Sequence, residues 1–286
     1  MLINLSSIGL QAVPNGPPKI DHGPCPTLIY YPAGGSNRFG NIDVCEGLAS
    51  HGYVVLAVDG PHDAPVVVFP DGSLCKGPLI GNYISPGVAD VSYLIAELDE
   101  LNAELNGLMD TVRIGIFGHS RGGYISNIVA FQHANVLAAV SMDSYLWGYA
   151  SKGTGLERHP ADFQEKVRST PKSILRLCGR PSEFEPQEEA RYCLERDGRE
   201  FVGDVTAVAF TGWKHADFMT TPWLCGKGAD IAANQSKAKT ESGEILTAIL
   251  NAFFDACLRG CERNRLRDCV SRWPTLGLAA KRSSAG

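Results

Sequence analysis

The feature that most constrains the fold is a regular alternation of short apolar runs with segments of helical spacing. The runs expected to form strands are 27–31, 53–58, 112–117, 136–142, 173–178 and 205–210. These runs do not alternate apolar with polar residues, so each predicts a strand that is buried on both faces. Buried strands that are joined by helices predict a parallel, doubly wound α/β sheet.

Four segments have the spacing and end signals of helices. They cover residues 39–52, 85–106, 121–133 and about 241–261. The second shows the signals best, because Ser85 is a capping residue, Pro86 suits the first helical position and Gly107 follows the last turn. A long loop over 59–83 precedes this helix, with an expected turn at Asp71-Gly72.

The length and composition suit one α/β domain over 1–286 with a large core, since the chain has 286 residues of which 44% are hydrophobic. The first 26 residues are expected to be irregular, apart from one short strand at 2–9. The net charge is −5 and the basic residues are scattered, which argues against nucleic acid as a partner. No transmembrane segment is expected, because the longest apolar run, 245–258, is short and carries Asp255.

The N-terminus lacks the basic region and the long apolar core of a signal peptide, so none is expected, and the compartment stays open. Nine cysteines are present, without a CxxC pair or a Cys/His spacing typical of zinc sites. No metal is therefore expected, while the pairing of the cysteines and the oligomeric state stay open.

Ser120 lies at the centre of Gly118-His119-Ser120-Arg121-Gly122, between a predicted strand and a predicted helix. This Gly-x-Ser-x-Gly pattern is typical of a nucleophile elbow, a sharp turn in which flanking side chains would strike their neighbours. The bare pattern also arises by chance in glycine-rich chains, where it is only a turn, but here the context is the one that the elbow requires. The sequence therefore predicts Ser120 as a nucleophile.

A serine nucleophile needs a histidine base, which an acid must orient, and in this architecture the chain order is serine, acid, histidine. Of the seven histidines, only His159 and His215 follow the elbow and its helix. His159 precedes a strand, whereas His215 follows the last one, at the edge where catalytic groups gather. His215 is the expected base.

Two strand-end loops offer the acid. Asp143 directly follows the strand after Ser120, and Glu183 and Glu185 follow the next strand. Asp143 has the shorter side chain and the better fixed backbone, while the glutamates also fit the acidic start of a helix. The residues favour Asp143 but leave the glutamates open.

An oxyanion hole needs two backbone N–H groups. One is expected from Arg121, the residue after the nucleophile. The other is expected from the loop 31–37, where Gly34-Gly35 would let the main chain approach a substrate closely, although a simple strand-to-helix turn would look the same.

These segments resemble the platelet-activating-factor acetylhydrolase group of α/β-hydrolases and its microbial relatives, over about residues 27–225. The resemblance rests on "LASHGYVVLAVDGPHDA", "VVVFPDG", "GHSRGG", "VSMDSYLWG" and "HADF". It implies the α/β-hydrolase fold, a mostly parallel doubly wound sheet with helices on both faces. It also implies a triad of Ser120, Asp143 and His215, with oxyanion donors at Gly34 and Arg121. "GHSRGG" is also similar to chlorophyllase, more weakly.

The sequence thus predicts a cofactor-free serine esterase that cleaves a small-molecule carboxylic ester through an acyl-enzyme. An acyltransferase, thioesterase, cyclase or lactonase would use the same triad, and a non-catalytic binding protein is a less favoured alternative. Residues expected to line the site, or else to pack beneath its loops, are Tyr145, Leu146, Trp147, Phe218, Met219, Trp223 and Leu224. This set favours a substrate with an apolar group.

Overall fold

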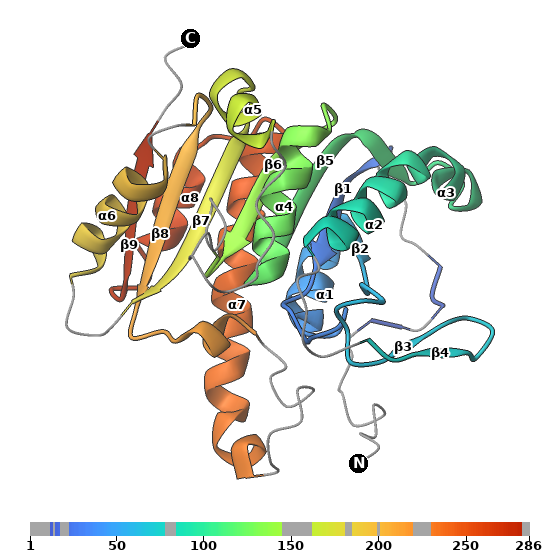
Figure 1. Ribbon diagram of the computed structural model, residues 1–286. Coiled ribbons are helices and arrows are strands. Elements are labelled where there is room, and N and C mark those ends of the chain that lie inside the picture. Colours follow the sequence, from blue (N-terminus) through green and yellow to red (C-terminus); the bar gives the residue numbers. More distant parts are fainter. Residues whose placement is uncertain are drawn as a thin grey trace.

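The computed structural model describes residues 12–13, 15–17, 23–77, 84–144, 162–180, 185–198, 201–219 and 230–281. Within these ranges the chain forms a seven-stranded sheet of order β2-β1-β5-β6-β7-β8-β9 (Figure 1). Its strands are β1 Cys25–Tyr31, β2 Val54–Ala57, β5 Met109–His119, β6 Val136–Met142, β7 Ser173–Arg180, β8 Val205–Thr211 and β9 Leu276–Lys281. Neighbouring strands are parallel except for the antiparallel pair β8 and β9. The predicted mostly parallel sheet is confirmed.

Helices cover both faces of this sheet (Figure 1). One face carries α1 Ile42–Ser50, α7 Asp230–Leu258 and α8 Asn264–Val270. The other carries α2 Ile84–Ala96, α3 Leu98–Glu104, α4 Arg121–Gln132, α5 Phe163–Ser169 and α6 Pro186–Gly198. Among the described residues, no helix has the length and apolar character needed to span a bilayer.

The two-sided cover explains why the strands are unbroken apolar runs. Successive residues of a strand point to opposite faces. In β1, Leu28 and Tyr30 therefore pack on the α1 and α7 side, whereas Ile29 and Tyr31 pack on the α2 and α4 side. All four side chains are at most 1% exposed, and burying each contributes about 1.5–3 kcal/mol.

Some elements differ from the prediction. The expected helix 85–106 is divided at Glu97 into α2 and α3, although its N–H still donates to the Tyr93 carbonyl at helical spacing. The second piece ends at Glu104, earlier than expected, and Asn106 and Gly107 follow it with φ +55° and +76°. The short strands β3 Val67–Val68 and β4 Leu74–Cys75, the helices α5 and α8 and the edge strand β9 were not predicted. The strand expected at 2–9 lies outside the described residues.

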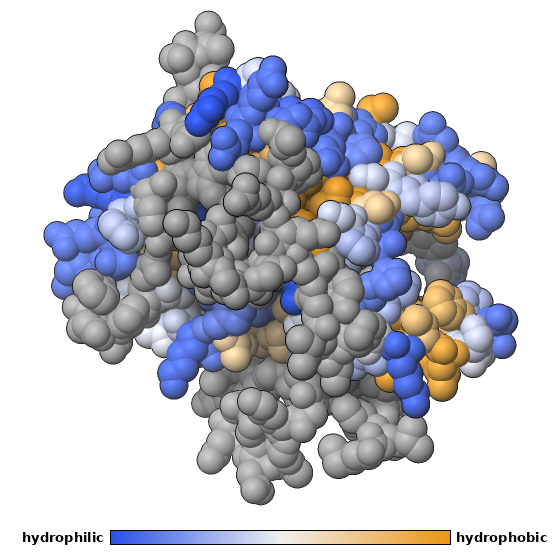
Figure 2. Space-filling view, viewed as in Figure 1, coloured by the Kyte–Doolittle hydropathy of each residue, from blue (hydrophilic) through white to orange (hydrophobic). Residues whose placement is uncertain are grey.

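Strands β3 and β4 form a hairpin within the loop that follows β2. Its turn contains Gly72 with φ +81°, at the predicted Asp71-Gly72 position. The exposed apolar residues of this segment are Val66, Val68, Phe69 and Leu74. Figure 2 shows apolar atoms gathered at the lower right, where Figure 1 places the hairpin. The hairpin therefore presents apolar side chains to solvent on the described surface.

Candidate active site

Ser120 occupies the turn between β5 and α4. Its backbone angles, φ +54° and ψ −119°, are rare for a residue with a side chain. Its N–H donates to the carbonyl of Met142 at 2.9 Å, so the turn is tied to the end of β6. Such a conformation costs about 1–3 kcal/mol and persists only where the surroundings fix it. This geometry is the one expected of a nucleophile elbow.

The glycines on either side of Ser120 have no space for a side chain. A Cβ at Gly122 would lie 2.2 Å from the carbonyl oxygen of Tyr31. A Cβ at Gly118 would lie 2.4 Å from the carbonyl carbon of Gly122. Because both neighbours are main-chain atoms, they have little freedom to move away. The two glycines are therefore needed for the steric reason that the sequence pattern predicts.

The structure brings His215 and Asp143 together across 72 positions of sequence. His215 begins a single 3₁₀ turn, His215–Phe218, that follows β8, and Asp143 directly follows β6. Nδ1 of His215 lies 2.6 Å from Oδ2 of Asp143. Oδ1 of Asp143 accepts a hydrogen bond of 2.9 Å from the N–H of Gly179, at the end of β7. Asp143 is itself held at φ +44°, with its N–H bonded to the carbonyl of Leu177.

These contacts determine the protonation state of the Asp143 carboxyl group. Burial raises the pKa of Asp143, but the hydrogen bonds from His215 and Gly179 outweigh burial and hold the pKa below its ordinary value of 3.8. Asp143 is therefore a carboxylate at neutral pH and can keep the proton of His215 on Nδ1. Nε2 of His215 is then the ring nitrogen available to exchange a proton with a nucleophile.

A second histidine lies beneath the first. The rings of His119 and His215 have centroids 4.5 Å apart, and His119 is only 1% exposed. Burial, with a smaller effect of the neighbouring His215, lowers the pKa of His119 to about 3, although Asp143 opposes the change. His119 is therefore neutral near pH 7 and adds no positive charge beside His215.

This buried histidine predicts a pH dependence of stability. The folded chain does not protonate His119 until the pH falls to about 3, whereas the unfolded chain does so near 6.5. Between these values only the unfolded state binds this proton. The free energy of unfolding should therefore decrease as the pH is lowered, by about 1.4 kcal/mol for each pH unit. His119→Gln should remove this slope. Urea unfolding at several pH values in the range measures it.

The control for this measurement is His51→Gln, which removes an exposed histidine in place of a buried one. Equal slopes for the parent and His119→Gln would show that His119 titrates normally in the folded chain.

Gly34 and Gly35 follow β1, and they differ in what they require. Gly35 has φ +74°, a conformation that favours glycine, and a Cβ there would meet nothing within 4 Å. At Gly34 a Cβ would lie 2.7 Å from Cζ of Arg121. The group that lies against Gly34 is therefore the guanidinium of Arg121. The close approach to a substrate that the sequence predicted for this glycine pair stays a prediction.

Sequence reasoning missed Asn41, which ties the loop after β1 to the histidine turn. Nδ2 of Asn41 donates to the carbonyl of Phe218 at 2.8 Å, and Oδ1 accepts from the hydroxyl of Tyr30 at 2.9 Å. Asn41, Tyr30 and Phe218 are all 0% exposed. A lone asparagine in a loop gives no pattern that would have revealed this contact.

The remaining predicted residues have different outcomes. Phe218 was expected at the site, but it is fully buried with its ring 5.1 Å from those of Phe210 and Trp213. Phe218 therefore packs beneath the site instead of lining it, which is the alternative expected for this set of residues. Its ring joins an aromatic cluster under the turn that carries His215. Met219 is half-buried. Outside the described residues lie Tyr145, Leu146, Trp147, Trp223, Leu224, His159 and Glu183.

Of the two other candidate acids, the structure describes Glu185. Glu185 is exposed, and its carbonyl accepts the N–H groups of Glu188 and Glu189 in the first turn of α6. Glu185 therefore lies at the start of a helix, as its sequence context also suggested. The part of the chain that the structure describes contains no group of three His, Cys, Asp or Glu side chains placed to bind a metal.

Comparison with known proteins identifies the fold. No family model matches the chain. A solved ferulic acid esterase from Streptomyces cinnamoneus is similar with a TM-score of 0.64 and 25% identity, over 89% of this chain and 74% of that one. The chain has the α/β-hydrolase fold. A curated protein of Arthroderma benhamiae, named as a probable 1-alkyl-2-acetylglycerophosphocholine esterase, is 29% identical over 147 residues.

The second match covers 50% of this α/β-hydrolase and 37% of the curated relative. The chemical name of that relative describes an esterase of the platelet-activating-factor acetylhydrolase kind, which confirms the resemblance seen in the sequence. Ser120, Asp143 and His215 also follow one another in the order that the catalytic groups of α/β-hydrolases have.

Proposed function

We propose that this α/β-hydrolase is a serine esterase that hydrolyses a small-molecule carboxylic ester through an acyl-enzyme. The observation that carries the proposal is the 2.6 Å contact between Nδ1 of His215 and Oδ2 of Asp143, at the same sheet edge as Ser120 in its strained turn. Both compared proteins are named as esterases, which supports the same class of reaction.

In the proposed mechanism, Oγ of Ser120 attacks the ester carbonyl while Nε2 of His215 takes its proton. Asp143 keeps Nδ1 of His215 protonated and stabilises the imidazolium that forms. The N–H groups of Gly34 and Arg121 stabilise the oxyanion of the tetrahedral intermediate. The alcohol then leaves with the proton from His215, and the acyl group stays on Ser120.

Water completes the cycle. His215 removes a proton from a water molecule, which attacks the acyl-enzyme and forms a second tetrahedral intermediate. When this intermediate breaks down, the carboxylic acid leaves and Ser120 regains its proton from His215. Every step uses groups of this chain and water, so the proposed reaction calls on no cofactor.

A panel of nitrophenyl esters from acetyl to decanoyl, with methyl ferulate added, tests the proposal. The two compared proteins motivate this range, because one name contains an acetyl ester and the other ferulic acid. We expect turnover of at least one ester by the parent and none by Ser120→Ala. Including methanol as an acceptor separates hydrolysis, which releases the acid, from acyl transfer, which yields the methyl ester. A folded parent that cleaves no member of the panel would contradict the proposal.

A further inference from the structure

We propose that the ion pair between Asp63 and Arg121 sets the geometry of the oxyanion hole, which makes Asp63 a positioning residue for the reaction. The inference rests on the proposed function, in which Gly34 and Arg121 supply the oxyanion donors. Asp63 lies in the turn after β2, a segment to which the sequence pattern assigned no role.

Asp63 connects the two main-chain segments that carry the donors. Its Oδ1 accepts a hydrogen bond from Nη1 of Arg121. The N–H of Gly35 donates to the carbonyl oxygen of Asp63 at 3.2 Å and lies 3.4 Å from Oδ1. Arg121 carries one proposed donor on its own main chain, and Gly35 is joined by a peptide bond to Gly34, which carries the other. Asp63 thus contacts both sides of the hole, the Arg121 side through its carboxylate and the Gly35 side through its main-chain carbonyl and, at longer range, through the same carboxylate.

The guanidinium of Arg121 lies directly against the main chain of Gly34. A Cβ at Gly34 would lie 2.7 Å from Cζ of Arg121 and 3.0 Å from Nε and Nη2. The side chain of Arg121 therefore packs directly on Gly34. Because the guanidinium is held by Asp63, the position of Gly34 against Arg121 is fixed before a substrate arrives.

Asp63 is itself rigidly placed. Its N–H donates to the carbonyl of Gly60 at 2.9 Å, and its side chain is only 3% exposed. Gly60 is fixed in turn, because a Cβ there would lie 2.1 Å from the hydroxyl oxygen of Tyr31. The anchor of the hole is therefore connected to the end of β1.

Burial distinguishes this pair from an ordinary surface salt bridge. The side chain of Arg121 is 24% exposed and that of Asp63 only 3%. Burial raises the pKa of Asp63, while the charge of Arg121 and the hydrogen bond from Gly35 oppose that rise. Removing one partner of such a pair leaves a buried charge without compensation, whereas replacing both with apolar residues avoids this cost. This difference allows stability and positioning to be tested separately.

The test compares Arg121→Met, Asp63→Asn and the double variant Arg121→Met/Asp63→Leu with the parent enzyme. We expect kcat to fall on the order of 10- to 100-fold in each, with KM within about 3-fold, because oxyanion donors act mainly in the transition state. The affinity for a trifluoromethyl ketone analogue of the transition state should fall by the same factor as kcat/KM. Arg121→Lys, which keeps the charge, should restore part of the loss.

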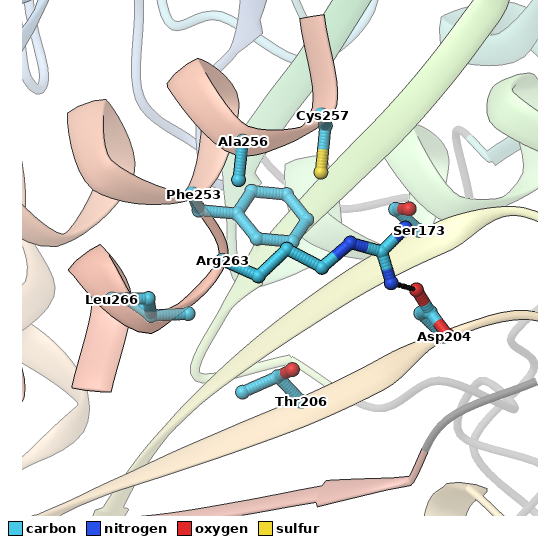
Figure 3. Close-up of a pocket in the computed structure, with 8 residues that line it drawn as sticks. All are labelled: Ser173, Asp204, Thr206, Phe253, Ala256, Cys257, Arg263 and Leu266. Atoms are coloured by element: carbon cyan, nitrogen blue, oxygen red, sulfur yellow. Dashed lines mark hydrogen bonds and ion pairs between the residues drawn. The ribbon is translucent and has the colours of Figure 1, made fainter. Parts of the chain in front are cut away.

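The double variant separates positioning from folding. It removes both charges, so its melting temperature should exceed that of Arg121→Met, yet its kcat should stay low. A control is Arg263→Met, which breaks the ion pair with Asp204 beside Ser173 and Thr206 (Figure 3). This pair lies near the amino ends of β7 and β8, whereas Ser120 follows the carboxyl end of β5. This control should lower stability and leave kcat unchanged.

The outcomes distinguish the two proposals. A parent that is neither active on esters nor labelled at Ser120 by a fluorophosphonate would overturn the proposed function and this inference with it. An active parent whose Arg121 and Asp63 variants fold and keep both kcat and the affinity for the ketone would overturn the positioning role alone. Recovery of kcat together with stability in the double variant would also overturn it.

Discussion

Ser120→Ala should lower kcat by a factor on the order of 10⁶, the scale of loss found when a serine hydrolase loses its nucleophile. The reason is that Ser120 is held at the elbow with φ +54°, at the same sheet edge as His215. Removing Oγ leaves only the oxyanion donors and substrate binding to assist the reaction. The measurement is the rate of ester hydrolysis, with the melting temperature as the check on folding.

Covalent labelling tests the role of Ser120 independently of the rate measurement. An activated serine reacts with a fluorophosphonate and an ordinary serine does not, so mass spectrometry should find the label on Ser120. The matched control is Ser126→Ala, in the second turn of α4, where the buried hydroxyl donates to the carbonyl of Gly122 at 2.7 Å. This variant should be labelled like the parent. A label on any other residue, or none on the folded parent, would rule out Ser120 as the nucleophile.

The fold was predictable where a strand is covered on both faces. The run 136–142 coincides with β6. Five of its seven side chains belong to the core on one face of the sheet or the other, so the strand shows no regular alternation of apolar and polar residues. Strand β9 gives no such signal, since "LGLAAK" lacks β-branched residues and lies at the antiparallel edge. The glycine of this strand, Gly277, packs against the first residue of α6. A Cβ at this position would lie 1.9 Å from the carbonyl oxygen of Pro186.

The residues of the candidate site differ in how far the sequence alone could predict them. Ser120 is marked by a local pattern, and His215 by its place after β8, the last strand that the sequence predicted. The acid was not decided by the residues, because the loops after β6 and β7 end at the same edge of the sheet. Supporting contacts such as Arg121 with Asp63 and Asn41 with Phe218 join residues 58 and 177 positions apart. No local spacing encodes contacts of this kind.

Asp143→Asn should lower kcat by a factor of about 10⁴ while the fold and KM are largely kept, as in the corresponding change in a serine protease. The amide can still accept the hydrogen bond of 2.9 Å from the N–H of Gly179, so the loop should keep its shape. Its NH₂ group would then point at Nδ1 of His215, where the parent has an acceptor 2.6 Å away. A donor at this position favours the tautomer with the proton on Nε2, which is unable to accept the proton of Ser120.

The controls are Glu183→Gln and Glu185→Gln. Their kcat values and melting curves are measured side by side with those of Asp143→Asn. Glu185 is exposed at the start of α6, so its loss removes a helix-terminal charge worth about 0.3–1 kcal/mol and should change kcat by no more than a few-fold. Glu183 follows the same strand and is expected to behave alike. If Asp143→Asn stays active while one glutamate variant loses activity, the acid follows β7. The short contact between Asp143 and His215 would then be structural, and the resemblance to the acetylhydrolase group would fail at the residue where it decided between the two loops.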